Sequence, residues 1–182
     1  NNEVKDLFGQ DSIISPPLES HLDISSILSF SVYLYYSILI TRDGKMQAIG
    51  SNSNGEIGKS INQTKLVHYT NFEIKDSQGR ICTPISALCG FKYSLYIIST
   101  PDNRTRLVYS YDFINEQYPL FLNIGDSNPI SIFGGENNSA AIDTKGRIIF
   151  IPYKLISESP NTQLKAISLP GGIKAVSVSC CN

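Results

Sequence analysis

The stretch SILITRDGKMQAIGSNSNGEIG, from Ser37 to Gly58, decides the fold of this 182-residue chain. It begins with an apolar run, reaches the turn residues Asp43 and Gly44, and continues into a second apolar run. Glycine tolerates the positive φ that tight hairpins require, so this half predicts two antiparallel strands. The second half, from Ser51, is a polar loop rich in glycine and asparagine. We therefore expect a strand pair followed by a shaped loop.

The end of this loop imitates a nucleotide-binding motif. Gly58, Lys59 and Ser60 match the last three positions of a phosphate-binding P-loop. The first glycine of that motif is replaced by Ser53, and residues 61–67 lack the apolar spacing of the helix that should follow. We interpret the stretch as a glycine-rich turn and Lys59 as a solvated side chain.

The pattern of serine, strand, turn and strand occurs three times in the chain. The second copy is SLYIISTPDNRTRLVYSY, from Ser94, and the third is SAAIDTKGRIIFIP, from Ser139. Gly146 follows Ser139 at the same spacing as Gly44 follows Ser37. In the second copy, residues 101–103 predict a longer turn at the same place.

The segments before these serines also match. Residues 84–94 and 129–139 both begin Pro-Ile-Ser and contain a glycine, Gly90 or Gly135, four residues before the serine. Residues 27–37 form the first copy, and residues 174–182 start the segment again. Units of about fifty residues with several short strands predict a propeller or a solenoid, in which neighbouring units bury each other's faces.

The repeats resemble those of the regulator of chromosome condensation family. Its pattern is a serine and an apolar strand, Thr-x-Asp-Gly, a second strand, and then a Gly-x-Asn-x-x-Gly loop, which residues 37–58 match. The Gly-x-x-His-Ser of the family is degraded, because Tyr36, Tyr93 and Asn138 occupy the histidine position. The repeat positions that the resemblance identifies are Ser37, Asp43, Gly44, Gly50, Asn52, Gly55, Gly58, Gly90, Ser94, Gly135, Ser139 and Gly146.

We therefore predict an all-β fold made of about three blades of a seven-bladed-type β-propeller, each a small antiparallel sheet, open at both ends. The expected strands are 28–32, 35–41, 45–50, 85–89, 94–99, 106–111, 130–134, 139–143, 147–152 and 174–179. Loops are expected near 51–75, 100–105, 112–128 and 153–172, with no convincing helix. The expected units are the end of a preceding blade (1–26), three repeats (27–83, 84–128 and 129–172) and the start of a further repeat (173–182).

Composition limits the classes of partner. The net charge is −1 and the sequence pI is about 6.1, so no direct nucleic-acid contact is expected. The uncharged stretch 24–41 is long enough to span a membrane, but its serines and tyrosines favour two strands, and no membrane association is expected. The chain begins Asn1-Asn2 without a start methionine, which indicates a piece of a longer protein. We expect that protein to be intracellular, in the cytoplasm or the nucleus. As an isolated piece it would expose sheet edges, so we expect it to be stable only within its parent or an assembly.

Residues that could carry chemistry are few. His21 lies beside Glu19 and Asp23, which we interpret as a solvated loop, and His68 as a half-exposed residue. The four cysteines lack zinc-site spacing and favour buried thiols in a reducing compartment. They are Cys82, Cys89, Cys180 and Cys181, and the last two leave a vicinal disulfide open. We expect no enzyme activity, no cofactor and no metal.

Two functions remain open. The degraded motifs and low charge favour a non-catalytic platform for protein–protein interaction. The alternative, implied by the resemblance, is a guanine-nucleotide exchange factor for a small GTPase; a secreted inhibitor of an enzyme is a third class. Tyr109, Tyr111 and Tyr118 either form a binding surface or fill the space between blades.

Overall fold

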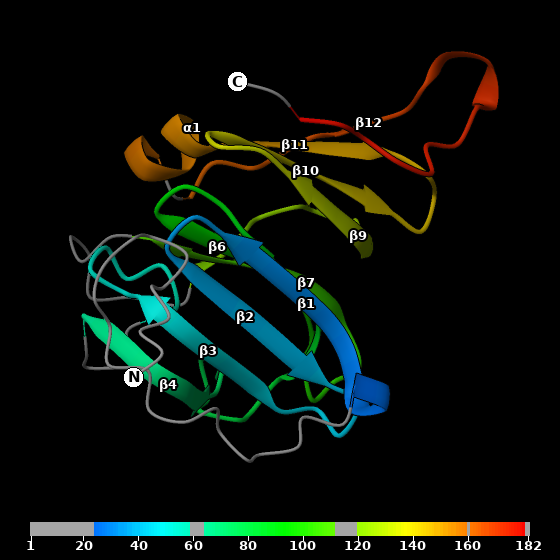
Figure 1. The fold of residues 1–182 in the computed structure, drawn as a ribbon. Coiled ribbons are helices and arrows are strands. Elements are labelled where there is room, and N and C mark those ends of the chain that lie inside the picture. The colour runs from blue at the N-terminus through cyan, green and yellow to red at the C-terminus, as the bar shows by residue number, and fades with distance from the viewer. Residues whose placement is uncertain (1–23, 59–63, 112–119, 160, 181–182) are drawn as a thin grey trace.

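The computed structural model describes residues 24–58, 64–111, 120–159 and 161–180. These residues confirm the expected all-β class, because they form three four-stranded antiparallel sheets that follow one another along the chain. Figure 1 shows the sheets as three separate blades in an open arrangement. The predicted repeat boundaries, after residues 83 and 128, fall near the first strands of the second and third sheets.

Each sheet has its strands in sequence order. Blade 1 contains β1 (Ile27–Tyr33), β2 (Tyr36–Thr41), β3 (Met46–Ser51) and β4 (Lys65–Phe72). Blade 2 contains β5 (Thr83–Cys89), β6 (Tyr93–Ser99), β7 (Thr105–Tyr111) and β8 (Leu120–Phe121). Blade 3 contains β9 (Pro129–Gly134), β10 (Asn138–Asp143), β11 (Ile148–Pro152) and β12 (Ala166–Ile167). The short helical segments are η1 (Ile24–Ser26), α1 (Tyr153–Glu158) and η2 (Pro170–Gly172).

The turns between the second and third strands are closed in the same way in all three blades. In blade 1 the Thr41 N–H donates to the Lys45 carbonyl and the Gly44 N–H donates to the Thr41 carbonyl, both at 3.0 Å. Residues 100–104 and 143–147 form the same pair of bonds. The prediction of a longer turn in blade 2 is therefore wrong. The paired strands β6 and β7 are longer than β2 and β3, but the turn between them has the same length as in blade 1. Asn103 takes the glycine place with φ 59°, a region that asparagine tolerates.

An aspartate caps the third of these turns. The Asp143 carboxylate accepts hydrogen bonds from the Lys145 and Arg147 N–H groups, each at 2.9 Å, and from Arg147 Nε at 2.7 Å. Burial alone would raise the pKa of Asp143, but these donors hold it below its ordinary value. Residues 76–80, which join blade 1 to blade 2, form the same arrangement, and the sequence comparison overlooked it.

Blade 2 lies between the other two blades and is covered on both faces. Ile38 and Ala48 of blade 1 pack in one cluster with Tyr96 and Val108 of blade 2. The opposite face carries Tyr93, Leu95, Ile97, Leu107 and Tyr109, which pack with Ala141, Ile149 and Ile151 of blade 3. Alternate residues of β6 therefore point to different neighbours, which explains why the strand is apolar along its whole length.

Three strands lie where loops were expected. β4 lies within the expected loop 51–75, β8 within 112–128 and β12 within 153–172. Each is the last strand of its sheet and pairs with one neighbour only. An outer strand needs few apolar residues, and β8 and β12 have two residues each, so the sequence pattern of these strands is weak.

Two further differences concern blade 3. The helix α1 was not expected, but Ile156 is buried and Tyr153 packs against the same cluster, so one side of this short helix covers blade 3. No strand forms at 174–179. The segment still lies beside blade 3, since the Ala175 N–H donates to the Gly146 carbonyl at 3.0 Å and Cys180 Sγ lies 3.8 Å from the Phe133 carbonyl. In each blade the first strand pairs with the next strand along the chain, and no such partner follows among the described residues.

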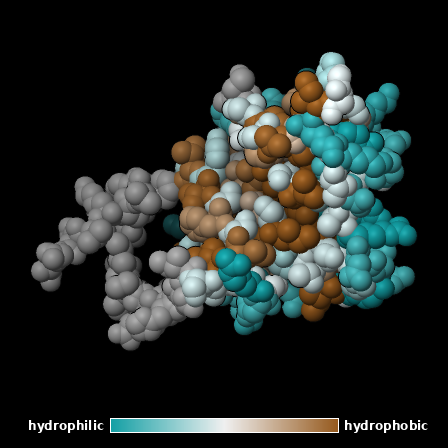
Figure 2. Space-filling model, turned by 90° about the vertical axis from the view of Figure 1, so that its right-hand side faces the viewer, coloured by the Kyte–Doolittle hydropathy of each residue, from teal (hydrophilic) through white to brown (hydrophobic). Residues whose placement is uncertain are grey.

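The loops gather at two ends of the blades. We call the end with the β1–β2, β5–β6 and β9–β10 turns and the β3–β4 loop the pocket rim, and the end with the other hairpin turns the opposite rim. The face shown in Figure 2, on the β1 side, has a hydrophobic centre. On β1, Leu28, Phe30 and Val32 alternate with less exposed residues and are 45%, 54% and 59% exposed. None of the helices described is long and apolar enough to cross a membrane.

Candidate functional site

The loop that imitated a P-loop is organised by one buried asparagine. Asn52 is 0% exposed, and its Oδ1 accepts a hydrogen bond from the Ile57 N–H at 2.9 Å. Its backbone N–H donates to the Thr64 carbonyl at 2.8 Å, which ties the two ends of the loop together. The next element after the loop is the strand β4, where a P-loop requires a helix. Lys59 and Ser60 lie outside the described residues.

The glycines of this loop allow close approaches. Gly50 has φ 109°, and a Cβ atom there would lie 2.2 Å from the Tyr35 carbonyl oxygen. Blade 2 holds the loop from the other side, because Ser110 Oγ donates to the Gly55 carbonyl at 2.8 Å and Tyr96 Oη to the Ile57 carbonyl at 3.1 Å. The loop is thus fixed in position at the junction of blades 1 and 2.

Tyrosines at the family's histidine position bridge neighbouring blades. The Tyr36 hydroxyl of blade 1 lies against the Tyr93 carbonyl and accepts hydrogen bonds from the Gly90 N–H and Ser94 Oγ of blade 2, each at 3.1 Å. Burial raises the pKa of Tyr36 well above its ordinary value, so the hydroxyl stays a donor.

The same bridge recurs one blade further along. Tyr93 Oη lies 2.6 Å from Ser139 Oγ and donates to the Gly135 carbonyl at 3.1 Å. A Cβ atom at Gly90 would lie 2.2 Å from the Tyr93 ring, which explains a glycine at that position. Gly90 and Ser94 therefore belong to the contact between blades 1 and 2, and Gly135 and Ser139 to the contact between blades 2 and 3.

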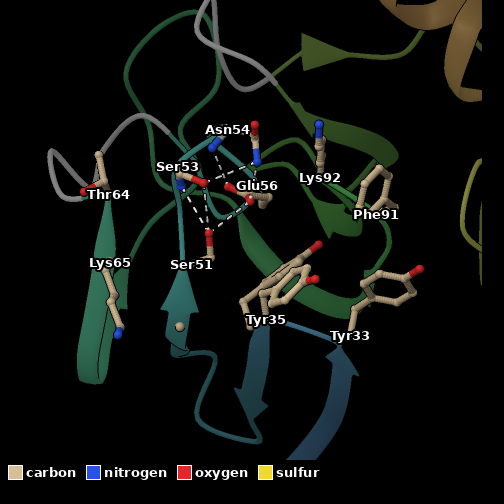
Figure 3. A pocket seen from close by; sticks show the side chains of 12 residues that line it. Tyr33, Tyr35, Ser51, Ser53, Asn54, Glu56, Thr64, Lys65, Phe91 and Lys92 are labelled. Atoms are coloured by element: carbon tan, nitrogen blue, oxygen red, sulfur yellow. Dashed lines mark hydrogen bonds between the residues drawn. The ribbon is translucent and has the colours of Figure 1, made fainter. Parts of the chain in front are cut away.

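A pocket of about 480 Å³ lies where blade 1 meets the β5–β6 turn. Its aromatic side chains are Tyr33, Tyr35, Tyr36 and Phe91, its lysines are Lys65 and Lys92, and its polar loop residues are Ser51, Ser53, Asn54, Glu56 and Thr64. Figure 3 shows the labelled tyrosines and Phe91 beside the hydrogen-bonded loop residues. We call this cavity the rim pocket. Its volume is in the range of sites that hold a small molecule or a few side chains of a partner.

A buried carboxylate lies beside the rim pocket. Glu56 is only 3% exposed, and it accepts hydrogen bonds from the Asn54 N–H and Asn54 Nδ2, each at 2.9 Å, and from Ser51 Oγ at 3.3 Å. These donors come from its own loop, so Glu56 shapes the pocket wall, and it forms no ion pair with a lysine of the described residues.

The lysines of the rim pocket are placed differently from the basic residues of the opposite rim. In the described part of the chain neither Lys65 nor Lys92 forms an ion pair. Lys92 Nζ lies 5.0 Å from the centre of the Phe91 ring, a cation–π distance. On the opposite rim the three hairpin turns hold the ion pairs Lys45–Asp43, Arg104–Asp102 and Arg147–Asp143. Arg42, in the first of these turns, is exposed and forms no ion pair within the described residues. The pocket rim thus places two exposed lysines without an ion pair in the described part of the chain beside the half-buried rings of Tyr33 and Phe91.

The residues expected from the sequence do not form one site. Asp43, Gly44 and Gly146 lie in turns of the opposite rim, whereas the bridge residues and the Asn52 loop lie at the pocket rim. Of the twelve positions identified, only Gly50 lines the rim pocket. The sequence analysis missed Tyr33, Tyr35, Phe91 and Lys92, although bulky aromatic residues in or beside short turns were a usable signal.

The other candidate residues have structural surroundings. Tyr109 stacks on Tyr93 with ring centres 5.3 Å apart, and Tyr111 meets Tyr153 edge-on at 4.7 Å, so both fill the space between blades 2 and 3. Burial raises the pKa of the Cys89 thiol to about 12, as expected for an unreactive buried cysteine.

Most of the remaining candidates lie outside the described residues. Tyr118, Cys181 and His21 with its acidic neighbours lie outside the described residues, while His68 lies in β4. Among the described residues no group of three histidine, cysteine or acidic side chains could hold a metal.

The three sheets form an open set of β-propeller blades, and the solved structures that they resemble have the regulator of chromosome condensation fold. No family model and no curated protein matches the sequence. Among solved structures, human WBSCR16 has a TM-score of 0.56 at 14% identity, covering 71% of this chain and 35% of that one.

Two yeast structures are similar to the same degree. Yeast RCC1 (Prp20) bound to Kap60 has a TM-score of 0.54 at 12% identity over 80% of this chain and 37% of that one. Prp20p from Saccharomyces cerevisiae, studied for its binding to Gsp1p and histones, has a TM-score of 0.54 at 13% identity, covering 80% of this chain and 39% of that one. The chain thus spans well under half the length of these structures, and at these identities the likeness establishes the fold.

Proposed function

We propose that this chain is a non-catalytic platform for protein–protein interaction and that the pocket rim is its docking surface. The observation that carries the proposal is the rim pocket, where aromatic rings and two lysines line a cavity beside a loop fixed between two blades. Within the described residues neither lysine forms an ion pair. Aromatic side chains dominate binding energy at protein interfaces, and a preformed loop reduces the entropy lost on binding. The similarity to Prp20, a structure solved with Kap60 bound, supports a protein partner.

The alternative function is guanine-nucleotide exchange on a small GTPase. The family resemblance implies it, and the structural similarity to Prp20p keeps it open. An exchange factor acts by binding the GTPase differently in its nucleotide-free and nucleotide-bound states, so it needs a protein-binding surface and no catalytic side chain.

Affinity capture from the protein's own cells tests both functions. The bait is the full-length protein carrying this chain, as wild type and as the variants Phe91→Ala and Lys165→Glu. Lys165 is an exposed residue of blade 3 that does not line the rim pocket, which makes it a control for expression and for charge. We expect Phe91→Ala to lose a partner that the wild type and Lys165→Glu retain. Equal recovery on all three baits would contradict a docking role for the pocket rim.

A wash with EDTA separates the two candidates. EDTA removes magnesium and stabilises nucleotide-free complexes of small GTPases. A GTPase that is retained through this wash and released by added GTP would favour the exchange function. Partners without a GTPase among them would favour the platform.

A further inference from the structure

The rim pocket has the features of a receptor for an acidic, partly apolar segment. Tyr33 and Phe91 come from different blades and both line the cavity. Burial and the nearby Glu136 carboxylate raise the pKa of Tyr33, so its hydroxyl remains a hydrogen-bond donor at neutral pH. Rings from two blades offer an apolar surface, and the tyrosine hydroxyl offers a donor at its edge.

Two ammonium groups define the charge that the pocket attracts. Lys65 begins β4 and Lys92 lies in the β5–β6 turn, and both line the cavity. The one carboxylate among the lining residues, that of Glu56, is buried and already accepts hydrogen bonds from Asn54 and Ser51. The accessible charge of the lining is therefore positive, and it is complementary to carboxylates on a partner.

The backbone at Lys92 adds an observation of the same kind. Its φ of 62° is in the left-handed region, where a lysine is less favourable than glycine or asparagine. This conformation places the lysine beside the Phe91 ring, with Nζ 5.0 Å from the ring centre. The turn thus presents an apolar ring and an ammonium group together at the pocket edge.

We propose that the rim pocket binds a short acidic segment of a partner protein. An apolar side chain of that segment lies between Tyr33, Tyr35 and Phe91, and its flanking carboxylates pair with Lys65 and Lys92. The inference rests on the proposed docking function of the pocket rim and adds the chemistry of the partner. Glu136, close to Tyr33, limits the side on which acidic residues are accepted.

Fluorescence anisotropy with three synthetic peptides tests the proposal on the full-length protein. The first probe carries Leu-Phe between Asp-Glu pairs, the second carries Leu-Phe between Lys-Arg pairs, and the third carries Ser-Ser between Asp-Glu pairs. We expect the first to bind at least about tenfold more tightly than either of the others, since both the charge and the apolar contact contribute. Its binding should weaken as salt rises, because the ion pairs are exposed.

Variants locate the binding. Removing one exposed ion pair weakens binding by up to about fivefold, and reversing the charge adds repulsion, so we expect about tenfold for Lys92→Glu. Lys165→Glu makes the same charge change on blade 3 and should leave the affinity within about twofold. Far-ultraviolet circular dichroism melts show whether each variant is folded. If Lys92→Glu is unfolded, Lys65→Glu serves as the second pocket variant.

The outcomes separate the inference from the function on which it rests. Equal or tighter binding of the basic probe, or an acidic probe insensitive to Lys92→Glu and Lys65→Glu, would overturn the acidic-segment proposal. If Phe91→Ala still abolished partner capture in that case, the docking function would stand and only the partner chemistry would be wrong. If capture were also unaffected, both would fall.

Discussion

The hydroxyl of Tyr93 provides a sharp test of how the blades are held together. Tyr93→Phe removes the hydroxyl and leaves the ring, so the stacking on Tyr109 and the packing of the second core cluster stay in place. What is lost is the bridge to Ser139 Oγ at 2.6 Å and to the Gly135 carbonyl at 3.1 Å. Ser139 is 1% exposed, so its hydroxyl loses a partner that water cannot easily replace.

The magnitude follows from these contacts. A buried hydrogen bond contributes about 0.5–1.5 kcal/mol, and a buried group left without a partner costs about 1–3 kcal/mol. We therefore expect Tyr93→Phe to lower the free energy of unfolding by about 1–3 kcal/mol. For a domain of this size that is a fall in Tm of about 2–12 °C, measured by calorimetry or circular dichroism.

A double-mutant cycle shows whether the energy belongs to the bridge. Tyr93→Phe combined with Ser139→Ala removes both partners, so Ser139→Ala should cost about 1 kcal/mol less in the Tyr93→Phe variant than in the wild type. Tyr111→Phe is the matched control, because Tyr111 lies in the same ring cluster and no hydrogen bond of its hydroxyl is found within the described residues. Its expected effect is below about 0.5 kcal/mol. Additive effects in the cycle, or an equal loss of stability for Tyr111→Phe, would show that the Tyr93–Ser139 hydrogen bond does not stabilise the contact between blades.

Three other predictions concern the turns and the loop, and thermal unfolding measures each of them. Gly50→Ala places a Cβ atom 2.2 Å from a backbone carbonyl oxygen and should prevent stable folding. A Cβ atom at Gly79 meets nothing within 4 Å, so Gly79→Ala should cost only about 1 kcal/mol for its positive φ, and similar melts for the two variants would contradict this. Asn52→Ala should cost about 1–3 kcal/mol, since the Ile57 N–H is left unpaired, and a smaller loss would show that water replaces the side chain. Asp143 has a lowered pKa in the folded state, so its contribution to the free energy of unfolding is present above about pH 4 and is lost as the pH falls through the lower folded value. Asp143→Asn should therefore reduce the fall in stability at acid pH, and an unchanged fall would contradict this prediction.

The blades could be predicted from the sequence because each hairpin is determined by residues that are close together in the chain. Each hairpin carries its own turn residues and two apolar strands, so nine of the ten expected strands form. The tenth, at 174–179, fails because a first strand needs its hairpin partner, which is not among the described residues. The outer strands were missed because pairing on one side requires little apolar sequence.

The candidate site could not be predicted in the same way. The rim pocket joins Tyr33 and Lys65 of blade 1 to Phe91 and Lys92 of blade 2, and their proximity depends on how the blades stack. The motif residues, by contrast, could be found in the sequence because each repeat needs the same contacts to pack against the next. Asn52 closes its own loop, and Gly90 and Ser94 contact the neighbouring blade, so a strong sequence signal indicated structure more than function.

The degraded histidine position has a physical explanation. Tyrosine at positions 36 and 93 still reaches the serine and the glycine turn of the next blade through its hydroxyl. The tyrosine hydroxyls at these two positions therefore hold neighbouring blades together.

Site-specific photo-crosslinking in the protein's own cells tests the central claim most directly. A photo-reactive amino acid replaces Lys92 in the rim pocket or Lys165 on blade 3 of the full-length protein. We expect a discrete crosslinked partner protein from position 92, whose crosslinked peptide is acidic, and none of it from position 165. The absence of a specific adduct at position 92, or the same adduct from both positions, would contradict a docking role for the rim pocket.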